Sequence, residues 1–257
     1  MISKTELKYY SSLLKKKFRD EEKKFLIEGT KLLEEAVGSN HSCEIIFMTN
    51  DFSKRYPGFI RSLTLKNYKV EVVRNQDFEK ISETVSPQGI AAVLKQPKNK
   101  KLNEKNLSPL IIYLENISDP GNLGTMIRTC DWFGINTLVL SENTVELYNP
   151  KVIRSSMGSI FHLNIFRDKR LAEMGTLKDK GYKFICADLD GTDIYTFNPP
   201  EKFVLFFSNE SSGPSPELLN LSDEKVTIPR EGKAESLNVA SASAIVVSEI
   251  AKKISKR

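Results

Sequence analysis

Two short runs in the second half of the chain, Leu110 to Leu114 and Phe203 to Phe207, consist of apolar residues only. A strand with one exposed face alternates apolar and polar residues, whereas a continuous apolar run of this length is typical of a strand covered on both faces. The two runs therefore predict an α/β domain with helices on both sides of a mostly parallel sheet. Further strands of this sheet are expected at Thr137 to Leu140, Lys183 to Ala187 and Lys225 to Ile228.

The first half of the chain predicts a second, smaller α/β domain. After a lysine-rich N-terminal helix, short apolar runs alternate with polar stretches that suit helices, at Phe25 to Ile27, Glu44 to Met48, Val70 to Val73 and Ile90 to Leu94. The segment 98–108 is rich in lysine and asparagine, has almost nothing to bury and predicts a linker. We therefore expect one domain at 1–97, a linker at 98–108 and a second domain at 109–257.

The net charge of +5 is spread unevenly along the chain. Residues 1–24 carry eight lysines and arginines against four acidic residues, and residues 95–105 carry five lysines against one glutamate. Such stretches are either solvated surface or a footprint for a polyanion, and charge alone leaves both interpretations open.

The sequence contains no apolar segment typical of a membrane protein or a secretory signal, and no cluster of residues typical of a metal site. No apolar run approaches the roughly 20 residues of a membrane-spanning helix, and the lysine-rich start lacks the apolar stretch of a secretory signal. We therefore expect a cytoplasmic protein. The three cysteines lie far apart in apolar stretches and only two histidines accompany them, which predicts reduced core thiols and no metal site.

Three segments that follow predicted strands carry the residues of a candidate site, because ligands bind beyond the carboxyl ends of strands in such sheets. In the first, an Asp-Pro-Gly turn leads into a helix that begins near Asn122, and Arg128 lies one to two turns further on. The second, Ser208 to Pro216, is a polar loop. The third, Pro229 to Ala244, ends in a helix rich in alanine and serine that Ser236 can cap. Each segment alone is compatible with an ordinary loop and helix cap.

Taken together, the three segments resemble the SpoU (TrmH) family of RNA 2'-O-ribose methyltransferases, within the SPOUT group. The first motif of that family, Asn-x-Gly followed by Arg-Thr, is similar to Asn122 to Thr129. The other motifs are similar to Phe207 to Gly213, to Ile228-Pro229 and to Ser236 to Val239.

The resemblance extends over nearly the whole chain. The stretch Pro150 to Ser159 is also similar to the family. Phe25 to Gly29 and Pro87 to Ile90 resemble the substrate-binding domain of the ribosomal protein L30e type that these enzymes carry.

The resemblance implies a fold, a cofactor and partners. The fold is an α/β sheet whose C-terminal segment forms a deep trefoil knot, the cofactor is S-adenosylmethionine, and the protein acts as a homodimer with a target site formed across the dimer interface. Its substrate is RNA, and the N-terminal domain favours ribosomal over transfer RNA.

The resemblance also implies site residues. Those assigned to the cofactor are Ser208, Asn209, Gly213, Ile228 and Leu237. Those assigned to catalysis are Arg128, Asn122, Ser236, Asn238 and Glu210. Those assigned to RNA binding are Lys15, Lys16, Lys17, Arg19 and Arg154.

Arg128 is the residue that the resemblance assigns to deprotonation of the ribose hydroxyl. Arginine, however, is effectively always protonated and has no acceptor site, so a general-base role conflicts with its chemistry. We therefore expect its guanidinium to grip the target phosphate and to stabilise the developing alkoxide.

Some residues depart from the family pattern or suggest other functions. Ser208 stands where relatives commonly have glycine, and Arg230 stands where they often have an apolar residue. The run Asp188 to Thr192 reads Asp-Leu-Asp-Gly-Thr and resembles the nucleophile motif of haloacid-dehalogenase-type phosphatases. Its late position in the chain favours a strand that ends in an Asp-Gly turn over a phosphatase site. The alternatives that remain are a transfer RNA methyltransferase, such a phosphatase, and an RNA-binding protein without activity.

Overall fold

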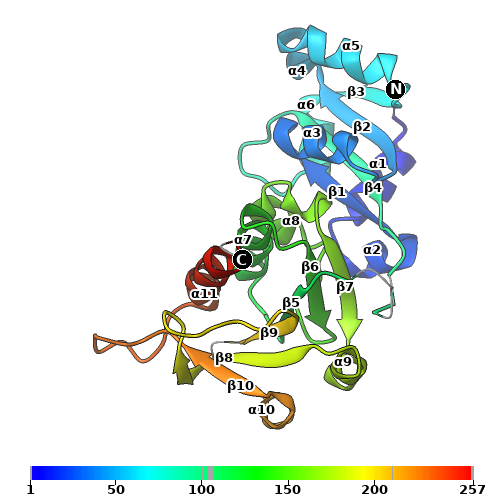
Figure 1. Ribbon diagram of the computed structural model, residues 1–257. Coiled ribbons are helices and arrows are strands. Elements are labelled where there is room, and N and C mark those ends of the chain that lie inside the picture. The colour runs from blue at the N-terminus through cyan, green and yellow to red at the C-terminus, as the bar shows by residue number, and fades with distance from the viewer. Residues whose placement is uncertain (1, 100, 103–106, 210, 256–257) are drawn as a thin grey trace. The chain divides into compact units, whose positions relative to one another are not determined.

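The computed structural model describes residues 2–99, 101–102, 107–209 and 211–255 (Figure 1). By its internal contacts the chain divides into two compact units. The first unit is Met1–Lys98 together with Tyr148–Phe161, and the second is Asn99–Leu147 together with His162–Arg257. In the part of the chain that the structure describes, no helix has the length and apolar character needed to cross a membrane.

The first unit is built on a mixed four-stranded sheet with the order β1-β4-β2-β3. Strand β4 is antiparallel to both of its neighbours, and β3 runs parallel to β2. The four apolar runs of the first half of the sequence form these strands, as predicted. The elements of residues 1–98 are α1 (Lys4–Ser12), α2 (Lys16–Glu22), β1 (Lys24–Glu28), α3 (Thr30–Gly38), β2 (Cys43–Thr49), α4 (Asn50–Arg55), α5 (Pro57–Leu65), β3 (Val70–Val73), α6 (Asn75–Phe78), the 3-10 helix η1 (Glu79–Ile81) and β4 (Ile90–Lys95).

The segment Tyr148–Phe161 belongs to the first unit although it lies far from it in the sequence. It contains α8 (Pro150–Ser156) and the 3-10 helix η2 (Ser159–Phe161). Helix α8 packs against β1, and the ring of Tyr148 stacks on that of Phe25 with 4.3 Å between their centroids. The domain boundaries at 97, 98–108 and 109 remain a prediction, and part of the expected linker, residues 100 and 103–106, lies outside the described residues.

The second unit is built on a six-stranded, all-parallel sheet with the order β10-β8-β9-β5-β6-β7. The parallel sheet predicted from the two apolar runs is confirmed, and those runs form the two central strands. The elements are β5 (Leu110–Glu115), α7 (Pro120–Trp132), β6 (Thr137–Ser141), β7 (Asn164–Lys169), α9 (Leu171–Lys178), β8 (Lys183–Asp193), β9 (Phe203–Ser208), α10 (Pro216–Leu221), β10 (Glu224–Thr227) and α11 (Val239–Ile254).

Helices on both faces explain why the central strands are apolar throughout. On one face, Ile111 and Tyr113 of β5 share a core with buried residues of α9 and α10, such as Met174 and Leu218. The intervening residues point to the opposite face because side chains alternate along a strand. Helices α7 and α11 pack against each other, and α11 also contacts β9 (Figure 1).

The run Asp188 to Thr192, which resembles the phosphatase motif, lies at a bulge between β8 and β10. Lys225 pairs with Cys186, but the next residue of β10 pairs with Thr192, so residues 187–191 of β8 are displaced from the ladder. A Cβ atom on Gly191 would lie 2.7 Å from the Lys225 carbonyl carbon and oxygen, so only glycine fits this approach of the two strands. The glycine of this run is therefore explained by packing.

Candidate functional site

A pocket lies at the carboxyl ends of β8, β9 and β10, where the rule for parallel sheets places a ligand. Its volume is about 380 Å³, which is within the range of about 300 to 1,000 Å³ of small-molecule sites. Apolar side chains from strands and from α11 form much of its wall, among them Phe207, Val226, Val239, Ala242 and Val246.

All five residues assigned to the cofactor line this single pocket. They come from two segments that are separate in the sequence. Ser208 ends β9, Asn209 and Gly213 lie in the loop that follows, and Ile228 and Leu237 lie in the long loop between β10 and α11. Ser208 is 9% exposed, and its backbone continues the ladder with Glu115 of β5. The serine in place of glycine is thus accommodated at the edge of the sheet.

The loop after β9 is tied to the loop after β5 by side-chain hydrogen bonds. The Nδ2 atom of Asn209 donates to the carbonyl oxygen of Asn116 at 3.1 Å and to Oγ of Ser118 at 3.0 Å. The carboxylate of Glu115, which is 5% exposed, accepts from both N–H and Oγ–H of Ser215, at 3.0 and 2.6 Å. These bonds hold the pocket wall in place, and the sequence analysis did not single out Glu115.

The start of α11 is joined to the start of α7 by two of the predicted catalytic residues. Asn238 is the N-cap of α11, and its Oδ1 accepts from N–H of Ala240 at 2.9 Å and of Ser241 at 3.3 Å. Its Nδ2 donates to Oδ1 of Asn122 at 3.1 Å. Asn122 lies in the first turn of α7, where its N–H donates to Oδ1 of Asp119 at 2.8 Å. The structure therefore joins two motifs that lie 116 residues apart.

Asn238 should stabilise the fold through its cap and the site through its contact with Asn122, and two substitutions separate these roles. Asn238→Ala is expected to cost about 1 kcal/mol through the lost cap, which corresponds to a Tm lower by about 2 to 4 °C. Asn238→Asp keeps a capping oxygen but removes the Nδ2 donor, so it should keep most of the Tm while lowering activity. Calorimetry beside a turnover assay measures both, and equal losses of Tm in the two variants would contradict this assignment.

The remaining predicted catalytic residues are not all at the pocket. Ser236 lines it, but Arg128 does not. Arg128 is exposed on α7, and no side chain in the described part of the chain forms an ion pair with it. Glu210 lies outside the described residues. Asn238 does not line the pocket, but it lies between Leu237 and Val239, which do, and it is hydrogen-bonded to Asn122. A single copy of the chain thus places Ser236 in the pocket wall and the two asparagines beside it, and leaves Arg128 on the surface.

Several pocket residues were assigned to no site by the sequence. Ala187, Asp188 and Leu189, in the bulge of β8, line the wall. Nζ of Lys225 lies 3.2 Å from Oδ2 of Asp188 and 3.3 Å from Oδ2 of Asp190. The hydrogen bonds that Lys225 donates to the carboxylates of Asp188 and Asp190 raise the pKa of Lys225. The run Asp188 to Thr192 follows a predicted strand, and this position could have indicated a pocket residue. Its similarity to the phosphatase motif suggested a different chemistry instead.

The two buried cysteines near the site do not provide a nucleophile. Burial raises the pKa of the Cys130 thiol in α7 to about 12 and that of Cys186, next to the pocket in β8, to about 12. Both thiols are therefore protonated near neutral pH, whereas covalent catalysis by cysteine needs a thiolate. Within the described ranges, no group of three or more His, Cys, Asp or Glu residues could hold a metal ion.

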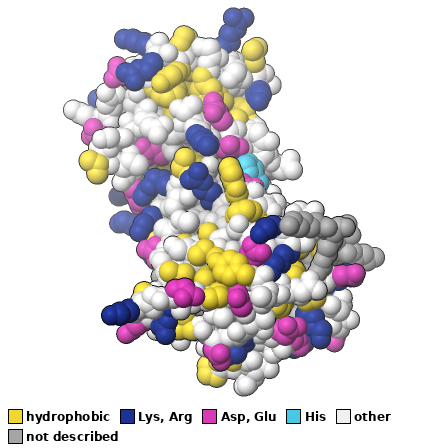
Figure 2. All heavy atoms as spheres, turned by 60° about the vertical axis from the view of Figure 1, so that its left-hand side comes forward, with side chains coloured by type: hydrophobic (Ala, Val, Ile, Leu, Met, Phe, Trp, Pro, Cys, Tyr) yellow, Lys and Arg dark blue, Asp and Glu magenta, His cyan; other side chains and the backbone are white. Residues whose placement is uncertain are grey.

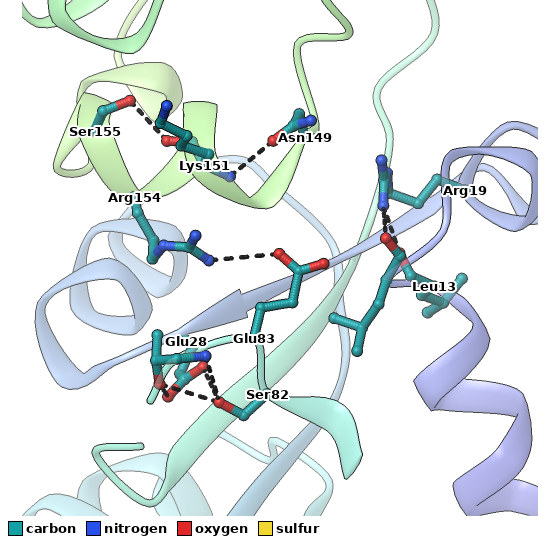
Figure 3. A network of polar contacts seen from close by, with 11 residues as sticks. Leu13, Arg19, Glu28, Ser82, Glu83, Asn149, Lys151, Arg154 and Ser155 are labelled. Atoms are coloured by element: carbon teal, nitrogen blue, oxygen red, sulfur yellow. Dashed lines mark hydrogen bonds and ion pairs between the residues drawn. The ribbon is translucent and has the colours of Figure 1, made fainter. Parts of the chain in front are cut away.

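The five residues assigned to RNA binding all lie in the first unit. Figure 3 shows two of them, Arg19 and Arg154. Arg19 is only 2% exposed, and its Nη1 donates to the carbonyl oxygens of Leu13 at 2.9 Å and Leu14 at 2.7 Å. It ties α2 to the end of α1, so its guanidinium would have to leave these carbonyl oxygens to reach a phosphate, and an RNA contact of Arg19 stays a prediction.

The other four basic residues also remain predictions. Lys15, Lys16 and Lys17 are exposed, and two of them form ion pairs one helical turn along α2, from Lys16 to Asp20 at 3.2 Å and from Lys17 to Glu21 at 4.0 Å. Arg154 of α8 is half-buried, and its Nη1 lies 3.8 Å from Oε2 of Glu83 (Figure 3). Exposed pairs of this kind contribute little, so these cations can exchange their partners.

The parallel sheet with a pocket at the carboxyl ends of its strands defines the second unit as a ligand-binding domain of the α/β class. The profile of the SpoU rRNA Methylase family matches residues 109–248, and the profile of the MRM3-like substrate binding domain matches residues 4–92. The chain therefore belongs to the SpoU rRNA methylase family, with an N-terminal MRM3-like substrate-binding domain, and the family predicted from the motifs is confirmed.

Individual relatives match along the whole chain. The chain is 34% identical over 243 residues to the 23S rRNA (guanosine(2553)-2'-O)-methyltransferase RlmP of Bacillus subtilis, covering 94% of each protein. It resembles the structure of a Porphyromonas gingivalis protein assigned to the TrmH family of RNA methyltransferases, with 31% identity, a TM-score of 0.86 and coverage of 97% of this chain and 98% of the other. An AdoMet-bound rRNA methyltransferase from Sinorhizobium meliloti is 25% identical, with a TM-score of 0.85 and coverage of 98% and 97%.

Proposed function

We propose that the protein transfers a methyl group from S-adenosylmethionine to a ribose 2'-hydroxyl of ribosomal RNA. The observation that carries this proposal is the convergence of the residues assigned to the cofactor on one pocket. Family membership supports methyl transfer, and the relative in Bacillus subtilis is named for 2'-O-methylation of 23S rRNA. The MRM3-like domain supports a structured ribosomal RNA over transfer RNA as the substrate.

The residues of the pocket fit S-adenosylmethionine. The apolar wall formed by Ile228, Leu237 and Val246 suits the adenine, and the loops at 208–213 and 228–237 present polar backbone groups to the rest of the molecule. The carboxylate of Asp188 on the same wall can accept from a hydroxyl or an amino group of the cofactor. When bound, the cofactor supplies an electrophilic methyl group.

The residues around the pocket would act mainly by positioning. The acceptor oxygen must lie in line behind the methyl carbon, and such alignment alone can provide a large part of the rate. The pair Asn122–Asn238 fixes the mutual position of α7 and α11, and Ser236 lies in the adjoining loop. Arg128 would hold the phosphate next to the target ribose and stabilise the oxygen as it loses its proton.

We propose a homodimer in which Arg128 of one copy completes the pocket of the other. The support is the placement of Arg128 on the surface of α7, away from the pocket of its own chain. Trp132 lies one helical turn further along the same face and is 81% exposed. A large apolar side chain so exposed is typical of a protein interface.

We also propose that the C-terminal segment forms the trefoil knot. Strand β10 lies at one edge of the sheet, yet α11, which follows it, packs against α7 and β9 nearer the centre. The chain therefore returns across the sheet between β10 and α11. A ribosomal-protein-like fold of the N-terminal domain and a cytoplasmic location remain predictions of the sequence.

The proposed cofactor site is tested by placing a charge in the pocket. Leu237 is 46% exposed, so Leu237→Asp should fold normally, but a carboxylate in the pocket wall would have to be desolvated when the cofactor binds. We expect Kd for S-adenosylmethionine, measured by calorimetry, to rise about 10-fold or more. The matched control is Leu219→Asp, on α10 outside the pocket, where Leu219 is 38% exposed.

The proposed reaction is tested in parallel with labelled S-adenosylmethionine. Ribosomal RNA from a strain without the gene should gain label at one nucleotide, and digestion should recover a 2'-O-methyl nucleoside. Label on transfer RNA alone would favour the transfer RNA alternative. Cofactor binding without transfer to any cellular RNA would leave a binding protein.

A further inference from the structure

A second cavity, of about 460 Å³, lies wholly within the first unit. Its lining comes from the end of β2, from α4 and α6, and from the loop that precedes β4. No residue of this cavity was assigned a role by the sequence motifs except the run Pro87 to Gly89, which resembles the substrate-binding domain. We call this cavity the Tyr56 pocket.

An aromatic wall bounds the Tyr56 pocket. The ring of Tyr56 is 45% exposed and lies 4.7 Å, centroid to centroid, from that of Phe52, which is 5% exposed. Phe59 lies behind Phe52 at 6.4 Å. Tyr56 is held between α4 and α5, since its N–H donates to the Phe52 carbonyl at 3.0 Å and Pro57 follows it as the first residue of α5. The ring is therefore an exposed, firmly supported platform.

The opposite wall is polar and close to the backbone. Oε1 of Gln88 accepts from N–H of Thr30 at 3.3 Å, which directs the Nε2 donors of this amide elsewhere. Gly89 has φ +81°, and a Cβ atom there would lie 2.6 Å from Oγ1 of Thr49, so glycine lets this loop close against β2. Asn75 donates from Nδ2 to Oδ2 of Asp51 at 3.1 Å, and both line the cavity.

The cavity itself is unsuited to a phosphate, whereas its rim is suited to one. Asp51, Glu79 and Arg55 all line the cavity, and the two carboxylates outnumber the single guanidinium and would repel an anion. The segment 50–66, in contrast, carries Lys54, Arg55, Arg61 and Lys66 against Asp51 alone. All four cations are exposed, and none forms an ion pair with the described residues. Figure 2 shows Lys and Arg side chains gathered over α4 and α5 at the top.

We propose that the Tyr56 pocket binds an unstacked nucleobase of the substrate RNA, with the flanking phosphates on the basic rim of α4 and α5. An exposed aromatic face, amide and carboxylate groups that can read a base edge, and a surrounding row of unpaired cations form the combination that recognises a splayed-out nucleotide. This inference deepens the proposed function and rests on RNA being the substrate. It also adds α4 and α5 to the RNA footprint predicted on α2, where Lys16 and Lys17 have acidic partners.

The test is the KM of the full-length enzyme for ribosomal RNA from a strain without the gene. Tyr56→Ala should raise KM about 10-fold or more, because stacking on one aromatic ring contributes about that much per base. The kcat value and Kd for S-adenosylmethionine should not change, since both belong to the second unit. Tyr56→Phe should retain the wild-type KM, and Tyr56→Leu, apolar but without a π face, should not.

Two further measurements separate stacking from stability and from the proposed reaction. Thermal unfolding should be nearly the same in all three variants, because Tyr56 is half-exposed. Filter binding of the same RNA should show the loss of affinity of Tyr56→Ala even if no methyl transfer is found, in which case the proposed function fails and the pocket stands. An unchanged KM and an unchanged affinity in Tyr56→Ala, or wild-type values in Tyr56→Leu, would overturn the proposed pocket while methyl transfer stands.

Discussion

Replacement of Arg128 by alanine is expected to lower kcat for RNA methylation by about 10²- to 10³-fold, the usual effect of removing one donor to a developing oxyanion. The side chain is exposed on α7 and contributes no buried contact, so folding should be unaffected. It does not line the cofactor pocket, so Kd for S-adenosylmethionine should remain within about twofold of the wild-type value. A large loss in kcat with cofactor binding intact is therefore the expected result.

The conservative variant distinguishes a charge role from a base role. Arginine stays protonated at any pH at which the enzyme is folded, and lysine keeps the charge but not the planar fork. Arg128→Lys should therefore recover part of the activity, and its activity should rise with pH no more steeply than that of the wild type. Arg170→Ala, an exposed arginine of the same unit, is the control and should be silent. Full activity in Arg128→Ala would remove this residue from the mechanism.

The central strands of the second unit could be predicted because strands buried on both faces appear in the sequence as continuous apolar runs. The runs at Leu110 and Phe203 are apolar on both faces, and helices do cover both faces of β5. Strand β7 (Asn164–Lys169) was missed for the opposite reason. It is the last strand at its edge of the sheet, and Phe166 is its only buried residue, so neither alternation nor a continuous apolar run marks it.

The cofactor segments were predictable as segments, but their contacts were not. A motif identifies which loops follow the central strands, and the sheet topology then brings three of them to one edge. The hydrogen bond from Asn238 to Asn122 joins residues 116 positions apart, and the hydrogen bond from Ser215 to Glu115 joins residues 100 positions apart. Such pairings depend on the strand order, which no local pattern contains.

The basic residues show where counting charges reaches its limit. Lys16, Lys17 and Arg19 are neighbours in a lysine-rich run, yet two are paired on the surface and the third is buried against backbone carbonyls. The cations of α4 and α5 are more widely spaced, so they form no basic run from which the sequence would predict RNA binding. Whether a cation is available depends on which carbonyl or carboxylate the fold places beside it.

At a cofactor concentration near the wild-type Kd or below, where Leu237→Asp is nearly inactive as Arg128→Ala is, mixing the two variants is expected to restore about a quarter of the wild-type activity if the site is shared between two copies. In a dimer of one Arg128→Ala chain and one Leu237→Asp chain, one site combines the intact Arg128 with the intact pocket, and the other lacks both. Half of the randomly assembled dimers are mixed and half of their sites are intact, which gives about a quarter. Each variant alone should remain inactive under the same treatment.

A second mixture makes the test independent of any partial activity in the single variants. An equal mixture of wild-type chains and chains that carry both substitutions should also keep about a quarter of the activity. In each mixed dimer, one site has the intact pocket without Arg128 and the other has Arg128 without the intact pocket, so only the wild-type dimers are active. If each chain were self-sufficient, this mixture would instead keep about half, and the two single variants would restore nothing. Exchange of subunits must be checked with a tagged chain, since the expected values assume random assembly. Equal activities in the two mixtures would place Arg128 of one copy at the pocket of the other. This arrangement would explain why Arg128 lies on the surface of the single chain, beside the exposed Trp132.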